Sequence, residues 1–422
     1  MTQSGQTPDR PWSALRWGGP AIVDQVLSSG TQLLLVVLVA RSAPAAVFGA
    51  VSVAVLVHGF LLGSVRALVA DVVLIRCRRA GSDTDHEARL GLFLAIAFGI
   101  AGGALVAIAG LVVGGEVGRF LLLFAGAVPF VHGQEVLRSV AYGERRLADA
   151  VVLDGVWMAV QVLVTVALLL VDGASARLLV LAWALGAGAS LLSGCVRRRL
   201  RPSGRGARSW ISADRKRGLG FLGDFTISTG VIQASFLVLG ATLPLAQFGT
   251  FRLAFVSVSP LANVMAGVRS LTLARLAEVD QDRARAASLA RRAAIVFATF
   301  ATTYGLVLGL LPAAAGVAVF GSTWRAARHL VAFVALGEVF RMGTLPAIDL
   351  LKVVASPGLL VRTRIVTSCL LVGGILVGGA TAGARGAVVG TAVALAAAGL
   401  VWWSRVRAIE RQPPWERSES EV

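Results

Sequence analysis

Residues 24–49 read DQVLSSGTQLLLVVLVARSAPAAVFG, and residues 224–249 repeat the pattern as DFTISTGVIQASFLVLGATLPLAQFG, 200 positions further along the chain. Seven of the 26 aligned positions are identical without a gap, and they include an Asp, a Pro and a Phe-Gly pair. Two unrelated apolar helices rarely share these residue types in register. We therefore expect a duplicated unit of about 200 residues.

A second segment supports the duplication. The sequence FVHGQEVLR at 130–138 recurs as FVALGEVFR at 333–341, and Arg66 matches Arg269 loosely, both at an offset of 203. Internal repeats of this size are a common plan of membrane transporters, in which the substrate site lies at the interface between the repeats.

The composition excludes an ordinary soluble domain. Hydrophobic residues make up 56% of the 422 residues, charged residues only 15%, and the mean hydropathy is +0.78. Soluble domains have roughly 45–50% apolar and about 25% charged residues. The three cysteines are odd in number and widely spaced, so they suggest neither disulfides nor a metal site. No metal, cofactor or nucleic-acid partner is expected.

The apolar windows predict an all-α polytopic membrane protein, because about 20 apolar residues cross the hydrocarbon layer. Six windows fall in each repeat, and an even number gives both repeats the same orientation, so they are expected to be parallel copies around a central cavity. The twelve expected spans are 19–40, 47–70, 90–112, 119–140, 149–171, 177–196, 219–240, 247–270, 293–315, 326–347, 359–379 and 385–404.

The basic residues predict the orientation. The segments on one side carry 29 Lys or Arg and the loops on the other side carry six, so both termini are expected in the cytoplasm of a bacterium. The expected parts are a cytoplasmic N-terminus (1–18), an N-terminal six-helix lobe (19–196), a basic linker (197–218), a C-terminal six-helix lobe (219–404) and a cytoplasmic tail (405–422).

The linker at 197–218 is the densest basic stretch of the chain. It is explained either as a topology signal or as a surface segment attracted to anionic lipids, at about 1 kcal/mol per basic residue near the headgroups.

Ten charged side chains lie within or at the ends of the expected spans. Each costs at least ~2.5–3.5 kcal/mol when it faces lipid at the bilayer centre, so each should face a partner, the bundle interior or a wet cavity. They are Arg66, Arg138, Arg252, Arg269, Arg341, Asp24, Glu135, Asp154, Asp224 and Glu338.

Glu135/Arg138 and Glu338/Arg341 have i,i+3 spacing, which places each acid and base on one helical face. In each pair the acid and base either neutralise only one another or line the central cavity. Because the pair recurs in both repeats, the cavity role is favoured. Asp24 and Asp224 are expected about a turn inside the cytoplasmic ends of their helices, where they could complement the helix dipoles, hold a coupling ion or form an ion pair.

Uncharged polar residues within the spans also leave two roles open. Gln32, Gln161 and Gln233 could bond between helices or contact a substrate. His58 and His132 have no metal-binding spacing and are expected to be hydrogen-bonded within the bundle.

Several motifs resemble the polysaccharide flippases of the Wzx-like branch of the multidrug/oligosaccharidyl-lipid/polysaccharide (MOP) exporter superfamily. They are the opening DQ..SSG.Q.L...LVAR, Phe48-Gly49, Arg66-Ala67-Leu68 and QEVLR..AYGERR at 134–146. The resemblance implies two six-helix lobes around a cavity that opens alternately to either side. It implies no catalysis, and a role in moving a polyprenyl-diphosphate-linked oligosaccharide outward for cell-surface polysaccharide synthesis, with other polysaccharide-assembly proteins as partners.

The chemistry of such a cargo assigns roles to these side chains. Arginines suit the diphosphate because the guanidinium fork makes paired, charge-assisted hydrogen bonds. Gln32, Gln161, Gln233 and the aromatic face of Trp157 would contact the sugar.

Two other functions stay open at this stage. The carboxylates favour a cation-coupled drug or metabolite antiporter of the same superfamily, with Asp24 as the coupling residue. A membrane-embedded glycosyltransferase or acyltransferase is disfavoured, because the longest outer loops have about ten residues and leave no room for a catalytic loop.

Overall fold

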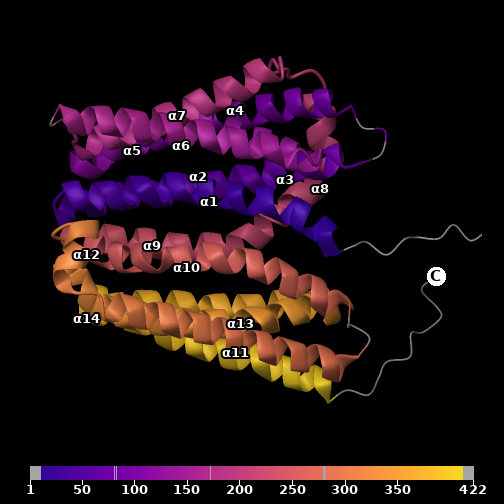
Figure 1. The fold of residues 1–422 in the computed structure, drawn as a ribbon, viewed down its shortest axis with the longest axis vertical. Helices are drawn as coiled ribbons and strands as arrows, with labels where there is room; N and C mark the ends of the chain where they lie inside the picture. Colours follow the sequence, from indigo (N-terminus) through magenta and orange to yellow (C-terminus); the bar gives the residue numbers. More distant parts are fainter. Residues whose placement is uncertain (1–10, 80, 82, 172, 279–281, 412–422) are drawn as a thin grey trace, which may run out of the picture. The chain divides into compact units, whose positions relative to one another are not determined.

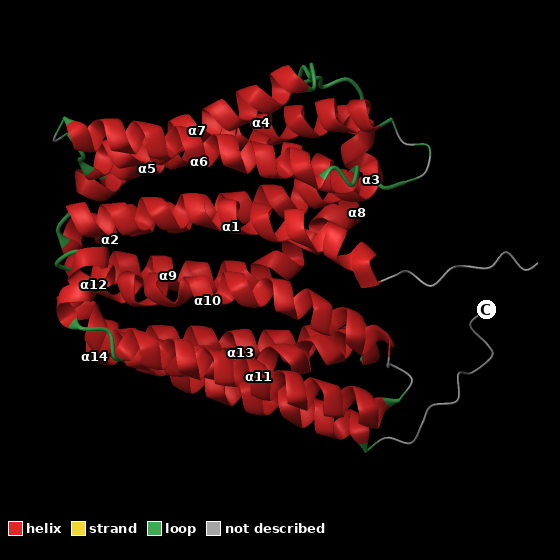
Figure 2. Cartoon of the chain, in the orientation of Figure 1, coloured by secondary structure: helices red, strands yellow, loops and turns green. Residues whose placement is uncertain are grey.

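The computed structural model describes residues 11–79, 81, 83–171, 173–278 and 282–411, and every regular element in these ranges is a helix (Figure 2). The start of the expected N-terminus and the end of the expected tail lie outside the described residues. The all-helical architecture confirms the expected all-α class.

The chain divides into two compact units, of which the first contains Val57–Gly223 and the chain up to Val39. Its long helices run side by side along one direction (Figure 1). The helices up to the end of this unit are α1 (Pro11–Ser42), α2 (Ala45–Val65), the π-helix η1 (Arg66–Ala70), α3 (Asp71–Cys77), α4 (Thr84–Val113), α5 (Gly115–Gly143), α6 (Leu147–Leu170), α7 (Ala176–Arg197) and α8 (Ala207–Phe225).

The second unit contains Ala40–Leu56 and the chain from Asp224 onward. Phe236, Phe248, Phe251 and Trp324 belong to an apolar cluster of this unit. Its helices are η2 (Thr226–Gly230), α9 (Val231–Thr242), α10 (Leu245–Glu278), α11 (Arg283–Gly309), α12 (Ala313–Phe320), α13 (Trp324–Val354) and α14 (Pro357–Glu410).

The described helices supply twelve segments long enough to cross a membrane. Ten stretches of the described chain are long and apolar enough to cross a membrane. The α14 stretch breaks at Gly383, where φ is 60°, and therefore supplies two spans. Helix α10 has 34 residues and is about 50 Å long at 1.5 Å per residue. Counting α10 and both halves of α14 gives six spans up to Arg197 and six after it.

The duplicated Phe-Gly motif makes a close crossing of two helices in the second unit. A Cβ atom on Gly49 of α2 would come within 2.1 Å of the Leu245 carbonyl oxygen, and one on Gly249 of α10 within 2.2 Å of the Ala45 oxygen. Each glycine thus contacts the residue four positions before its repeat counterpart. This reciprocal approach explains why the motif occurs in both repeats, because small residues let membrane helices pack backbone to backbone.

Most of the expected linker at 197–218 is helical, and the helix that leads into the seventh span begins at Ala207, before the expected start at 219. Its second half forms α8, which continues through η2 into the seventh span. Trp210 of α8 donates a hydrogen bond to Glu87 at 2.9 Å, and Arg76 binds Asp214 at 3.0 Å and lies 5.4 Å from the Trp210 ring. These contacts fix α8 to the ends of α3 and α4.

The ninth expected span, 293–315, also differs. Pro312 lies inside this expected span, but α11 ends before it at Gly309 and α12 begins directly after it. Proline has no amide hydrogen for the helical ladder, so it starts the next helix more readily than it continues one.

Candidate functional site

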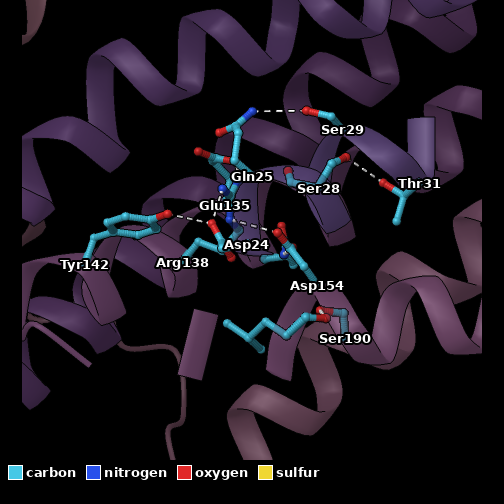
Figure 3. A network of polar contacts seen from close by, with 12 residues as sticks. Asp24, Gln25, Ser28, Ser29, Thr31, Glu135, Arg138, Tyr142, Asp154 and Ser190 are labelled. Atoms are coloured by element: carbon cyan, nitrogen blue, oxygen red, sulfur yellow. Dashed lines mark hydrogen bonds and ion pairs between the residues drawn. The ribbon is translucent and has the colours of Figure 1, made fainter. Parts of the chain in front are cut away.

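Arg138 of α5 is the centre of a buried charge cluster in the first unit (Figure 3). Its Nη2 atom lies 2.8 Å from Asp24, its Nη1 atom 3.2 Å from Glu135 and its Nε atom 3.3 Å from Asp154. All four side chains are buried. Three carboxylates therefore surround one guanidinium.

Helices α1, α5 and α6 bring this cluster together. The α5 helix presents Gln134, Glu135, Arg138 and Tyr142 at helical spacing, so all four reach the same region. Tyr142 donates to Asp24 at 2.7 Å, as Figure 3 shows, and Gln134 donates to Asp154 at 2.7 Å.

Arg66 completes the cluster from η1. Its Nε atom donates to Glu135 at 2.8 Å, while its side chain is 48% exposed. The cluster then holds three carboxylates and two arginines, a formal charge of −1. One oxygen of Asp24 and one of Asp154 have no hydrogen-bond partner among the described residues. Excess negative charge at membrane depth is costly, so a proton or other cation would stabilise it.

The second unit contains a cavity of about 560 Å³. Hydroxyl, amide and aromatic groups line it together with six charged side chains. The charged residues are Asp224, Arg269, Glu338, Arg341, Lys352 and Arg364. Ligand pockets in proteins commonly have volumes of about 300–1,000 Å³, so this cavity has room for a polar headgroup.

Two of the four cations in the cavity have strong partners. Arg269 makes a bidentate pair with Asp349 at 2.7 and 2.6 Å, and Arg341 binds Glu338 at 2.6 Å. Among the described residues, the remaining two have long contacts only. Lys352 lies 3.9 Å from Asp349, and Arg364 lies 3.8 Å from Asp224.

The same charges therefore have different surroundings in the two repeats. Asp24 is fully buried against Arg138, whereas the side chain of its counterpart Asp224 is 69% exposed and lines the cavity. The i,i+3 ion pair expected from the sequence forms in both repeats. It is enclosed in the first unit and faces the cavity in the second.

The other sequence-predicted polar residues are distributed between packing and the cavity. Gln161 donates to the Thr31 carbonyl at 3.0 Å, which is the interhelical bond considered for it, and Trp157 donates to the Trp183 carbonyl at 3.0 Å. Gln32 is exposed. Gln233 lines the cavity, and its buried Oε1 has no partner among the described residues.

Arg252 does not line the described cavity. Its guanidinium lies 5.6 Å from the Phe236 ring centre. Further expectations need correction. Asp24 lies 13 residues after the start of α1 at Pro11, and Asp224 lies 17 residues after the start of α8 at Ala207, so neither complements the N-terminus of its helix. Both ring nitrogens of His132, and Nδ1 of His58, lack hydrogen-bond partners among the described residues. The expected hydrogen bonds of these histidines are therefore incomplete.

Within the described residues, no three His, Cys, Asp or Glu side chains form a group that could hold a metal ion. No protein-family profile and no curated protein sequence matches this chain. Solved structures do match over nearly the whole chain.

The inward-facing conformation of a multidrug resistance MATE family transporter of the MOP superfamily aligns with a TM-score of 0.69 and 13% identity, covering 92% of this chain and 96% of that one. Lipid II flippase MurJ in an inward closed conformation aligns with a TM-score of 0.67 and 12% identity over 93% and 87%. A MOP superfamily transporter from Pyrococcus furiosus aligns with a TM-score of 0.62 and 13% identity over 95% and 96%. This chain has the fold of the MOP transporters.

Sequence analysis did not predict three charged residues of the cavity region. Lys352 and Arg364 line the cavity, and Asp349 binds the cavity residue Arg269. Asp349 and Lys352 follow the expected span 326–347, whereas α13 continues to Val354. Arg364 falls in the expected span 359–379 and belongs to α14. The signal was available, because Asp349 and Lys352 have the same i,i+3 spacing as Glu135 and Arg138.

Proposed function

We propose that this protein moves a polyprenyl-diphosphate-linked oligosaccharide across the bacterial cytoplasmic membrane by alternating access. The cavity of the second unit is the observation that carries the proposal. Four bases and two carboxylates line it, so its charged lining favours an anionic ligand.

The other lining groups suit a sugar. Gln233 has a buried acceptor without a partner, which a sugar hydroxyl would satisfy. Thr229, Thr344 and Thr391 add hydroxyl groups, and Trp402 adds an aromatic face. Burying polar groups without partners is costly, so such a lining favours a ligand with many hydroxyls over an apolar one.

The lipid tail needs no cavity of its own, since it can stay in the bilayer while the polar headgroup crosses. One structural neighbour is a lipid II flippase, which supports a lipid-linked substrate on this fold. The resemblance to Wzx-like flippases directs the proposal towards cell-surface polysaccharide synthesis and towards both termini being cytoplasmic.

A reconstituted assay tests the proposal. The purified protein is placed in vesicles with a labelled polyprenyl-diphosphate oligosaccharide, and an added glycosidase reports how much label is exposed on each side. We expect label to become protected or exposed faster than in protein-free vesicles. Equal rates in both preparations would contradict the proposed function.

A second candidate is a cation-coupled antiporter, and the buried cluster around Arg138 favours it. Its formal charge of −1 and the Asp24 oxygen that has no hydrogen-bond partner among the described residues could bind a coupling proton. A neighbour on this fold is a multidrug resistance transporter. Uptake of a fluorescent organic cation under an imposed proton or sodium gradient, without movement of the lipid-linked sugar, would favour this candidate.

A further inference from the structure

Lys352 and Arg364 differ from the other bases of the cavity because neither has a carboxylate within hydrogen-bond distance among the described residues. Lys352 belongs to the last turn of α13 and Arg364 to the start of α14, so the short turn at 355–356 places both at one end of the cavity. Their carboxylate contacts are 3.9 and 3.8 Å long, beyond hydrogen-bond distance.

The carboxylates near these two bases are already used or poorly placed. Both oxygens of Asp349 accept hydrogen bonds from Arg269, at 2.7 and 2.6 Å, so Lys352 competes for an occupied partner. The side chain of Asp224 is 69% exposed and does not close on Arg364. Among the described residues, Lys352 and Arg364 are thus the cavity cations without a hydrogen-bonded carboxylate, so a ligand need not displace one to reach their donors.

We propose that Lys352 and Arg364 form the phosphate-binding subsite of this cavity, and that a diphosphate takes their donors. The inference deepens the proposed function and rests on it for the lipid-linked identity of the ligand. It assigns recognition to residues outside the duplicated Glu/Arg pairs. The other two cavity arginines, Arg341 and Arg269, stay bound to Glu338 and Asp349.

The two side chains have complementary chemistry for this task. Arginine offers a planar fork that binds two phosphate oxygens at once, and lysine offers a compact point charge on a flexible stem. Exposure of about 41% for the Lys352 side chain and 25% for Arg364 lets an anion reach both from the cavity. Lys352 and Arg364 belong to consecutive helices on either side of the α13–α14 turn, and both line the cavity.

The test measures binding of inorganic pyrophosphate to the purified full chain by titration calorimetry. Charge-assisted hydrogen bonds are worth about ten-fold or more in affinity. We expect Lys352→Gln and Arg364→Gln each to weaken binding about 10-fold and the double variant about 100-fold. Arg362→Gln is the matched control, because Arg362 is exposed on the same helix turn and does not line the cavity.

Unchanged pyrophosphate affinity in the double variant, or no binding by the wild-type protein, would overturn the subsite. An equal loss in Arg362→Gln would also overturn it, since general surface charge would then explain the binding. Geranyl diphosphate separates a lipid-linked ligand from a free anion. Tighter binding of geranyl diphosphate than of pyrophosphate supports the lipid-linked ligand, and exclusion of it contradicts that ligand.

The translocation assay separates failure of the subsite from failure of the proposed function. If the wild-type protein and the double variant move the labelled lipid-linked sugar at the same rate, the subsite is wrong and the function stands. If pyrophosphate binding depends on both residues while no lipid-linked sugar moves, the subsite stands and the function is wrong.

Discussion

The Nη2 atom of Arg138 lies 2.8 Å from Oδ2 of Asp24, in an ion pair that joins α5 to α1. Their repeat counterparts have other partners, because Arg341 binds Glu338 at 2.6 Å and Asp224 faces Arg364 at 3.8 Å. One duplicated set of charges is therefore closed in the first unit and lines a cavity in the second. On the proposed function, the first set would serve stability or ion coupling and the second would contact the ligand.

Replacing the two repeat-related arginines should have unequal effects on stability. Arg138→Met leaves three buried carboxylates without their central cation and should lower the free energy of unfolding by about 3–5 kcal/mol. Arg341→Met removes a side chain that is 34% exposed and should cost at most about 1 kcal/mol. Denaturant titration in detergent, followed by tryptophan fluorescence, measures both. Similar losses would contradict the difference in burial.

The reciprocal glycine crossing predicts a steric effect. Gly249→Ala places a methyl group 2.2 Å from the Ala45 oxygen, so the helices must separate. Overpacking of this kind costs about 1–3 kcal/mol. Gly373→Ala is the control, since a Cβ atom there meets nothing within 4 Å. Thermal unfolding should show a lower midpoint for Gly249→Ala alone, and a wild-type midpoint for that variant would refute the close crossing.

The attachment of α8 can be tested by proteolysis. Trp210→Ala removes the hydrogen bond to Glu87 and the ring beside Arg76, so α8 should detach more often from α3 and α4. Trypsin should then cut faster at Arg208 and Arg215, by several-fold, because cleavage follows local opening. Ile211→Ala is the control on the exposed face of the same helix. Equal cleavage of both variants would show that Trp210 does not hold α8.

Much of this fold could be predicted from the sequence. The twelve apolar windows all correspond to helices, because hydropathy over 20 residues is a strong signal for a membrane span. Helix ends were less predictable. The many basic residues at 207–218 gave no apolar window, so α8, which Trp210 and Asp214 attach to its neighbours, was not predicted. The expected span ended at 347, so Asp349 and Lys352 were not recognised as residues of α13.

The site was predictable in its residue types and less so in their partners. Spacing correctly predicted the Glu135–Arg138 contact, since i,i+3 residues share a helical face. It gave no sign that Asp24 and Asp154 bind the same guanidinium, because those contacts join separate helices. For the same reason the sequence alone could not distinguish the closed cluster of the first unit from the cavity of the second.

The central claim is that the cavity of the second unit binds a diphosphate headgroup and that the protein carries it across the membrane. The most direct test compares two labelled substrates in the same wild-type proteoliposomes. One is an oligosaccharide on a polyprenyl diphosphate, and the other carries the same sugar on the same polyprenol without phosphate. We expect rapid movement of the diphosphate-linked sugar and only protein-independent leakage of the uncharged one. Equal rates for the two, or movement of neither, would contradict the claim.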